Sequence, residues 1–166
     1  MDSVKDIPKD KRIRVVVDPS PTRQMFVGKA NYGYKICKGE YIAFLGNDVE
    51  VGKNWLTEGA EALQGVFPDG MGVISPNPTG PYHGLVSRKF IQKALQGRLF
   101  YPGYIHYHCD TELGMIAKRL NRFYWTPRFV IVDKCPHDAL WKEGQTKTMK
   151  QGADLFLKRR LIGFPP

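Results

Sequence analysis

Short apolar runs alternate along the chain with longer stretches of helical periodicity. Runs rich in β-branched and aromatic residues predict buried strands at residues 13–17, 41–45, 72–75 and 129–132. Apolar residues spaced three and four apart predict helices at residues 24–37, 55–63, 87–95, 111–120 and 153–161. We expect Asn54 and Asp110 to cap the second and fourth of these helices. The alternation predicts an α/β fold with a mostly parallel sheet flanked by helices.

The bulk composition is that of an ordinary globular protein. A chain of 166 residues fits one domain spanning residues 1–166, and 42% hydrophobic with 25% charged residues is typical of that class. No apolar run approaches the roughly 18 residues that a membrane-spanning helix needs. The first eleven residues are polar and charged, unlike a secretory signal, so we expect a cytoplasmic protein without a transmembrane segment. Three cysteines without a C-x-x-C pair indicate free thiols.

A net charge of +9 points to an anionic partner, such as nucleic acid, an acidic membrane surface or a nucleoside diphosphate. The densest basic patch, at residues 158–160, is explained equally well by a solvated helix end. No helix-turn-helix, RRM or zinc-finger signature is present, so specific nucleic-acid binding is not expected. A P-loop and a G-x-G-x-x-G motif are also absent, which argues against a kinase or a dinucleotide enzyme.

Polar residues at the ends of the predicted strands are the first candidates for a site, because ligands of parallel sheets bind at the carboxyl edge. These residues are Asp18, Asn47, Asp48, Glu50 and His137. Two carboxylates at one strand end are costly unless they face water, cations or a metal. Oxygen ligands of this kind suit Mg²⁺ or Mn²⁺, although an isolated N-D-x-E is more often a polar turn.

Residues 28–56, GKANYGYKICKGEYIAFLGNDVEVGKNWL, resemble family 2 glycosyltransferases of the GT-A fold, especially the rhamnosyltransferase-like branch. The positions in register are Ala30, Asn31, Gly33, Gly39, Glu40, Tyr41, Asn47, Asp48, Glu50, Val51, Trp55 and Leu56. The metal-binding D-x-D motif of that family falls on residues 46–48, where only its last acid, Asp48, is present.

A second block, from Gly84 to Leu120, resembles the acceptor half of the same family. The family's general base falls on Asp110, and Cys109 stands where an acid usually precedes it. His137 falls near the position that completes the metal or diphosphate site, with a surface loop histidine as the alternative. His83, His106 and His108 match no motif, and we expect them to line an acceptor pocket or to pack.

The resemblance implies an inverting transfer of a sugar from a nucleotide-diphospho sugar to a hydroxyl of a glycan, lipid-linked or protein acceptor. It implies Asp110 as the catalytic base. Asp18, Asn31, Asn47 and Asp48 would bind the nucleotide sugar, and Asp48, Glu50 and His137 would hold Mn²⁺ or Mg²⁺. Residues 1–75 would form the nucleotide and metal half, residues 76–150 the acceptor half, and residues 151–166 a C-terminal helix and tail.

The N-terminus departs from the family, whose members begin with a strand, a helix and a second strand. Here only residues 13–18 precede the matched region, so we expect a minimal or shortened domain. An unpaired strand edge invites another chain, which predicts a homodimer or a partner protein that covers residues 13–17. The alternatives are an inactive GT-A-like domain that binds a nucleotide or glycan and, less well supported, a basic nucleic-acid-binding module.

Overall fold

The computed structural model describes residue 16 and residues 25–46, 48–134 and 148–165. The helices are α1 (Phe26–Ile36), α2 (Trp55–Val66), α3 (Arg88–Ala94), α4 (Cys109–Arg119) and α6 (Lys150–Leu161). The strands are β1 (Tyr41–Phe44), β2 (Val49–Val51), β3 (Val73–Ser75), β4 (Gly84–Ser87), β5 (Phe123–Trp125) and β6 (Ile131–Asp133). Residue 16 alone is described from the predicted first strand, and it lies in no strand. None of the described helices is long and apolar enough to cross a membrane.

The α/β class is confirmed, with a mixed four-stranded sheet in the order β1-β4-β3-β5. Strand β4 pairs antiparallel with both β1 and β3, and β3 pairs parallel with β5. A mostly parallel sheet was expected, and among the described strands only the β3–β5 pair is parallel. The reason is β4, which follows β3 after a short Pro/Gly loop, and such a return produces antiparallel neighbours. Strands β2 and β6 form a separate antiparallel ladder.

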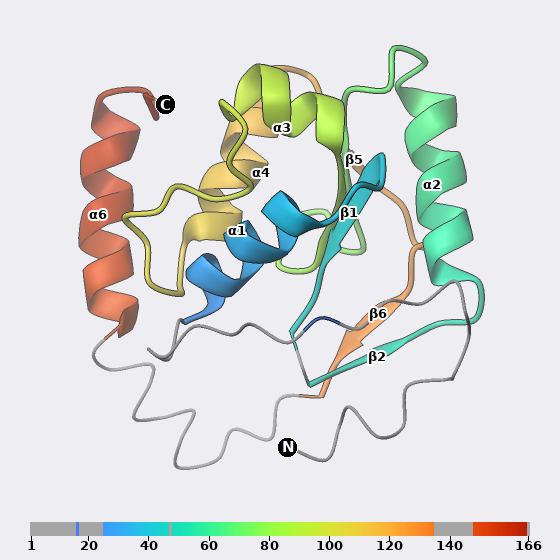
Figure 1. The fold of residues 1–166 in the computed structure, drawn as a ribbon, viewed down its shortest axis with the longest axis horizontal. Helices are drawn as coiled ribbons and strands as arrows, with labels where there is room; N and C mark the ends of the chain where they lie inside the picture. The colour runs from blue at the N-terminus through green and yellow to red at the C-terminus, as the bar shows by residue number, and fades with distance from the viewer. Residues whose placement is uncertain (1–15, 17–24, 47, 135–147, 166) are drawn as a thin grey trace.

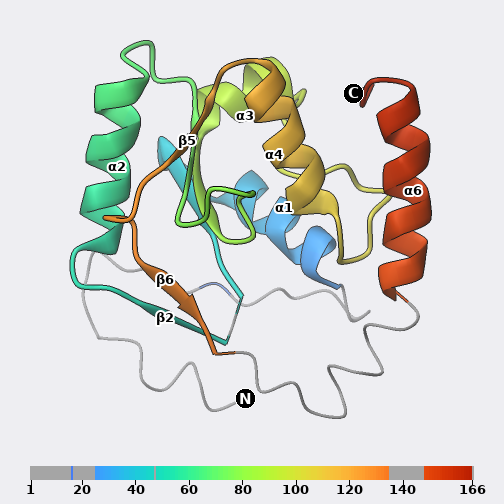
Figure 2. The same ribbon diagram turned by 180° about the vertical axis from the view of Figure 1, so that it is seen from behind.

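Both faces of the sheet are covered. Val73 and Val86 face the larger core cluster, which includes residues of α1, α3 and α4. Ile74 and Leu85 face the opposite way and pack with Phe129 and residues of α2. Figures 1 and 2 show α2 at one side of the molecule and α6 at the other, with the sheet and α4 between them. Strand β4, from the predicted acceptor half, thus lies between strands of the predicted nucleotide half.

Helix α6 packs closely against the segment that leads into α4. A Cβ atom at Gly152 would lie 2.7 Å from the carbonyl oxygen of Tyr107, so only glycine permits this approach. The ring of His108 stacks on Phe156, with 5.5 Å between centroids. Phe164, just after α6, is buried in the larger core cluster. The C-terminal helix is therefore an integral part of the same domain.

The cap predicted at Asp110 is wrong, and the cap predicted at Asn54 is correct in position only. Helix α4 begins after His108, which adopts φ 70°, and Asp110 lies within the first turn. Asn54 precedes α2 in a left-handed conformation and its side chain makes no capping hydrogen bond. A cap does form at α3, where Ser87 Oγ accepts a hydrogen bond from the Phe90 N–H at 3.1 Å. Asp110 is therefore a first-turn residue of α4 and not its N-cap.

Candidate active site

Asp48 lies just beyond β1, and its carboxylate occupies the space above Gly46. Asp48 Oδ1 is 2.5 Å from the point where a Cβ atom of Gly46 would lie. The Asp48 carbonyl accepts a hydrogen bond from the Lys134 N–H at 2.7 Å, which ties this residue to the end of the β2–β6 ladder. A side chain at position 46 would displace the carboxylate of Asp48. The glycine at position 46 thus leaves the space that the Asp48 carboxylate occupies.

His83 lies at the same place, although the sequence predicted only packing or pocket lining for it. Its Nδ1 accepts a hydrogen bond from the Gly46 N–H at 3.2 Å, and its Cε1 is 3.3 Å from the point where a Cβ atom of that glycine would lie. The side chains of Asp48 and His83 therefore converge on one point above Gly46. No sequence motif indicates this neighbourhood, because it depends on the register between β1 and β4.

Asp110 lies in the first turn of α4, where its Oδ1 accepts the Thr111 N–H at 2.7 Å. Burial raises the pKa of Asp110, and this effect is partly offset by the backbone N–H groups of Thr111 and of Asp110 itself and by nearby His108. No cation forms an ion pair with this carboxylate among the described residues. A buried carboxylate with a raised pKa is a stronger base than an exposed one.

His106 connects the two carboxylates. Burial lowers the pKa of His106, and the negative charges of Asp110 and Asp48 both oppose that shift. Both acids are therefore close enough to influence the same half-buried imidazole. The ring packs between Phe26 and Tyr107, with centroid distances of 5.5 and 4.6 Å. The predicted base and the predicted metal ligand thus belong to one region, although they are 62 positions apart in the sequence (110 minus 48).

Two other predicted site residues have different partners. Glu50 lies on β2, where its side chain is 70% exposed and pairs with Lys134 at 3.0 Å. The amide of Asn31 donates to the Phe100 carbonyl at 2.9 Å and accepts the Phe100 N–H at 3.0 Å. Asn31 therefore holds the loop after α3 against α1. The structure does not bring either side chain to the Asp48 carboxylate.

Three more predicted site residues, Asp18, Asn47 and His137, lie outside the described residues. Within the described part of the chain, no three His, Cys, Asp or Glu side chains form a group that could hold a metal ion. Of the predicted metal ligands, Asp48 is the one that is both described and without an ion pair among the described residues. Cys37 and Cys109 are free thiols, as expected.

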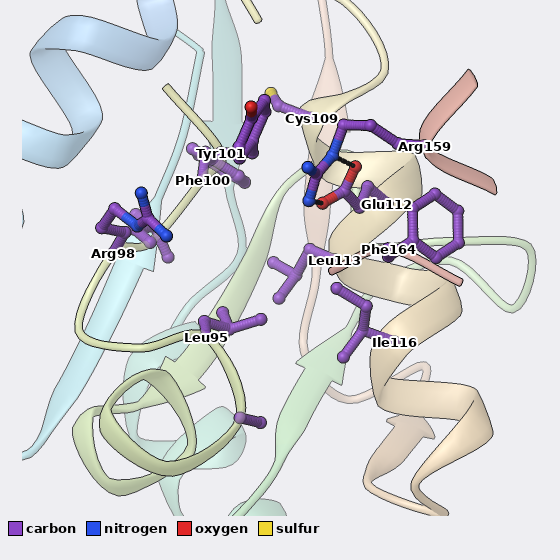
Figure 3. A pocket seen from close by; sticks show the side chains of 12 residues that line it. Leu95, Arg98, Phe100, Tyr101, Cys109, Glu112, Leu113, Ile116, Arg159 and Phe164 are labelled. Carbon is purple, nitrogen blue, oxygen red and sulfur yellow. Dashed lines mark hydrogen bonds and ion pairs between the residues drawn. The ribbon is translucent and has the colours of Figure 1, made fainter. Parts of the chain in front are cut away.

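A buried ion pair anchors the helix that carries Asp110, and no sequence motif indicates it. Arg159 donates from Nε and Nη2 to the two carboxylate oxygens of Glu112, both at 2.8 Å, as Figure 3 shows. Glu112 also accepts the Tyr104 hydroxyl at 2.8 Å, and the Arg159 guanidinium lies 3.5 Å from the ring centroid of Tyr101. Burial, together with the hydrogen bond to Glu112, raises the pKa of Tyr104.

The same ion pair shows that the basic patch at residues 158–160 is a solvated helix end only in part. Arg159 is 6% and Glu112 4% exposed, while the neighbouring Lys158 and Arg160 are exposed. A cavity of about 30 Å³ next to the pair, enough for a water or two, is lined by residues that include Arg98, Tyr101 and Cys109 (Figure 3). A helical pattern could have suggested the buried arginine, since Arg159 lies three residues after the buried Phe156.

The described geometry thus places two acids near one half-buried imidazole in an α/β domain. The chain belongs to glycosyl transferase family 2, whose family model matches residues 2–110. The match ends at Asp110, so most of α4 and all of β5, β6 and α6 lie beyond it. No curated protein and no solved structure matches the chain.

Proposed function

We propose that this protein is an inverting glycosyltransferase that moves a sugar from a nucleotide-diphospho sugar to an acceptor hydroxyl. Asp110 is the base in this proposal, and Asp48 lies at the diphosphate. The observation that carries it is the position of His106, whose pKa responds to both carboxylates. A base and a leaving-group site must lie close together, because the sugar occupies the space between them.

Asp110 takes the proton of the acceptor hydroxyl while that oxygen attacks the anomeric carbon and the bond to the diphosphate breaks. One displacement of this kind inverts the anomeric configuration. The raised pKa of Asp110 suits this role, because a stronger base removes a hydroxyl proton more readily. The short Thr111 N–H bond fixes the carboxylate, so that one oxygen remains available for the acceptor.

The donor set at Asp48 fits a hard divalent cation held mainly by substrate. Mg²⁺ is usually bound by one or two protein carboxylates together with phosphate oxygens, and Mn²⁺ accepts the same ligands. Such an ion supplies charge neutralisation on the departing diphosphate. The half-buried Asp48 carboxylate would hold it, whereas Glu50 is engaged by Lys134 on an exposed ladder.

Two measurements test the proposal together: the binding of nucleoside diphosphates and the turnover of a nucleotide sugar. We expect at least one of UDP, GDP and dTDP to raise the melting temperature, more so with Mn²⁺, because a ligand of the native state stabilises it. The corresponding nucleotide sugar should release its diphosphate when an acceptor is supplied.

We predict that Asp48→Asn loses the Mn²⁺-dependent part of nucleotide binding while the melting temperature of the free protein stays unchanged. The amide preserves the shape above Gly46 but removes the charge that attracts the ion. Asp154→Asn, an exposed acid on α6, is the matched control. Binding without any turnover of a panel of nucleotide sugars would instead identify an inactive nucleotide-binding domain.

A further inference from the structure

We propose that His83 is a binding residue for the diphosphate, donating a hydrogen bond from Nε2 to a phosphate oxygen beside Asp48. This inference rests on the proposed function and adds a residue that belongs to no motif of the chain. It concerns the imidazole that lies beside Gly46 and the carboxylate of Asp48.

The register of the sheet brings His83 to this place. Phe44 at the end of β1 pairs with Gly84 at the start of β4 in an antiparallel ladder. Continuing that ladder beyond the strand ends places the residues before Gly84 alongside those after Phe44. Gly84 is buried in a tight place, since its Cβ would lie 3.1 Å from both the Ile74 carbonyl and the Phe44 ring. The pairing of Gly84 with Phe44 thus positions the backbone next to His83.

The hydrogen bond from Gly46 determines what the imidazole can do. An N–H group donates to Nδ1 at 3.2 Å, so Nδ1 carries the lone pair and the proton of the neutral ring is on Nε2. Nε2 is then a donor without a lone pair for a metal ion. No described residue accepts a hydrogen bond from it, and the half-buried ring keeps it accessible to a ligand.

The ligand that fits is an anion rather than a second cation. One carboxylate and one N–H donor converge above Gly46. A divalent ion bound by Asp48 and a phosphate oxygen bound by His83 would satisfy both groups at once. A hydrogen bond to a charged group is worth enough to change affinity by roughly ten- to hundredfold.

Two substitutions separate this role from a structural one. In His83→Asn the side-chain oxygen can still accept the Gly46 N–H, but no donor reaches the Nε2 position. In His83→Gln the amide nitrogen can reach the Nε2 position, but the acceptor at Nδ1 is lost. Calorimetry with whichever of UDP, GDP and dTDP binds best, with and without Mn²⁺, gives the affinity, and thermal unfolding gives the stability. Tyr82→Phe, at the exposed neighbouring residue, is the control.

We expect His83→Asn to retain the melting temperature and to lose about tenfold or more in nucleotide affinity, both with and without Mn²⁺. His83→Gln should stay within a few-fold of the parent affinity although it melts earlier. Full affinity in His83→Asn overturns the assignment and leaves His83 as a support for Gly46. A parent protein that binds none of the three nucleotides overturns the proposed function, and this inference with it.

Discussion

The contact between α4 and α6 and the turn above Gly46 hold their acidic side chains in opposite ways. At the helix contact, Glu112 receives two hydrogen bonds from Arg159 and one from Tyr104, all at 2.8 Å and all shielded from water. At the turn, Asp48 is half-buried, and its carboxylate has no ion-pair partner among the described residues.

The difference separates an acid that supports the fold from one that is available to a ligand. A buried charge is tolerated only when fixed partners replace its hydration, and Glu112 has such partners. An acid that binds and releases a ligand must keep carboxylate oxygens that no protein group already occupies with hydrogen bonds or ion pairs. Asp110 lies two residues before Glu112 on α4 and is intermediate between these two cases. A backbone N–H holds its carboxylate, yet it has no ion-pair partner within the described part of the chain.

Removing the positive partner at the helix contact should have the largest effect. Arg159→Met leaves the Glu112 carboxylate buried and unpaired, and we expect the free energy of unfolding to fall by about 3–5 kcal/mol. Urea denaturation measures this loss. The matched variant Arg160→Met, at the exposed neighbouring residue, should change stability by no more than about 0.5 kcal/mol. Equal effects of the two variants would show that the buried pair is not an anchor.

Replacing the base should separate activity from stability. We expect Asp110→Asn to keep nucleotide binding and to lower turnover by roughly 10²-fold or more, because an amide cannot accept the proton. Turnover within a few-fold of the parent would remove Asp110 from the chemistry. A simultaneous loss of folding would also contradict the assignment.

The same variant should gain stability at neutral pH. Because burial raises the pKa of Asp110 above its unfolded value, its favourable contribution exists below the unfolded pKa and is lost as pH rises through the folded pKa. Asparagine is neutral at every pH and avoids that loss. The melting temperature of Asp110→Asn should therefore exceed that of the parent at pH 7, with the advantage disappearing below about pH 4. A variant that is less stable at pH 7 would show that the carboxylate is well compensated.

The smallest effect is expected at Glu50, whose ion pair with Lys134 is exposed on both sides. Glu50→Gln should change stability by less than about 1 kcal/mol and leave the Mn²⁺-dependent nucleotide affinity within a few-fold of the parent. Comparison with Asp48→Asn in the same titration is the direct measurement. A tenfold loss of affinity in Glu50→Gln would establish it as a metal ligand after all.

Elements with a clear hydrophobic pattern can be predicted from sequence. The helices have apolar residues three and four positions apart, and strand β1 is a continuous apolar run. The predictions for helices α2 and α4 and strand β1 lie within a few residues of the observed bounds. Strands β2, β4 and β5 are not predicted, and the residues of β2 have the composition of a polar turn. The position of Asp48 is predictable because it follows an apolar run.

Other parts of the site depend on contacts that no local pattern contains. The approach of His83 to Gly46 follows from the pairing of β1 with β4, which joins residues 37 positions apart. The helical spacing from Phe156 places Arg159 on the buried face of α6, but its partner Glu112 follows only from the way α6 lies on α4. Asn31 matches the family pattern, yet its partner is the backbone of Phe100.

The glycine at position 46 also determines how a second acid would have to be engineered into this site. A Cβ atom there would lie 2.5 Å from Asp48 Oδ1 and 3.3 Å from His83 Cε1, so any new side chain requires the Asp48 carboxylate to move. That carboxylate is the end of a flexible side chain, and a change of rotamer makes the room. Positions 46 and 48 are therefore best varied together in redesign.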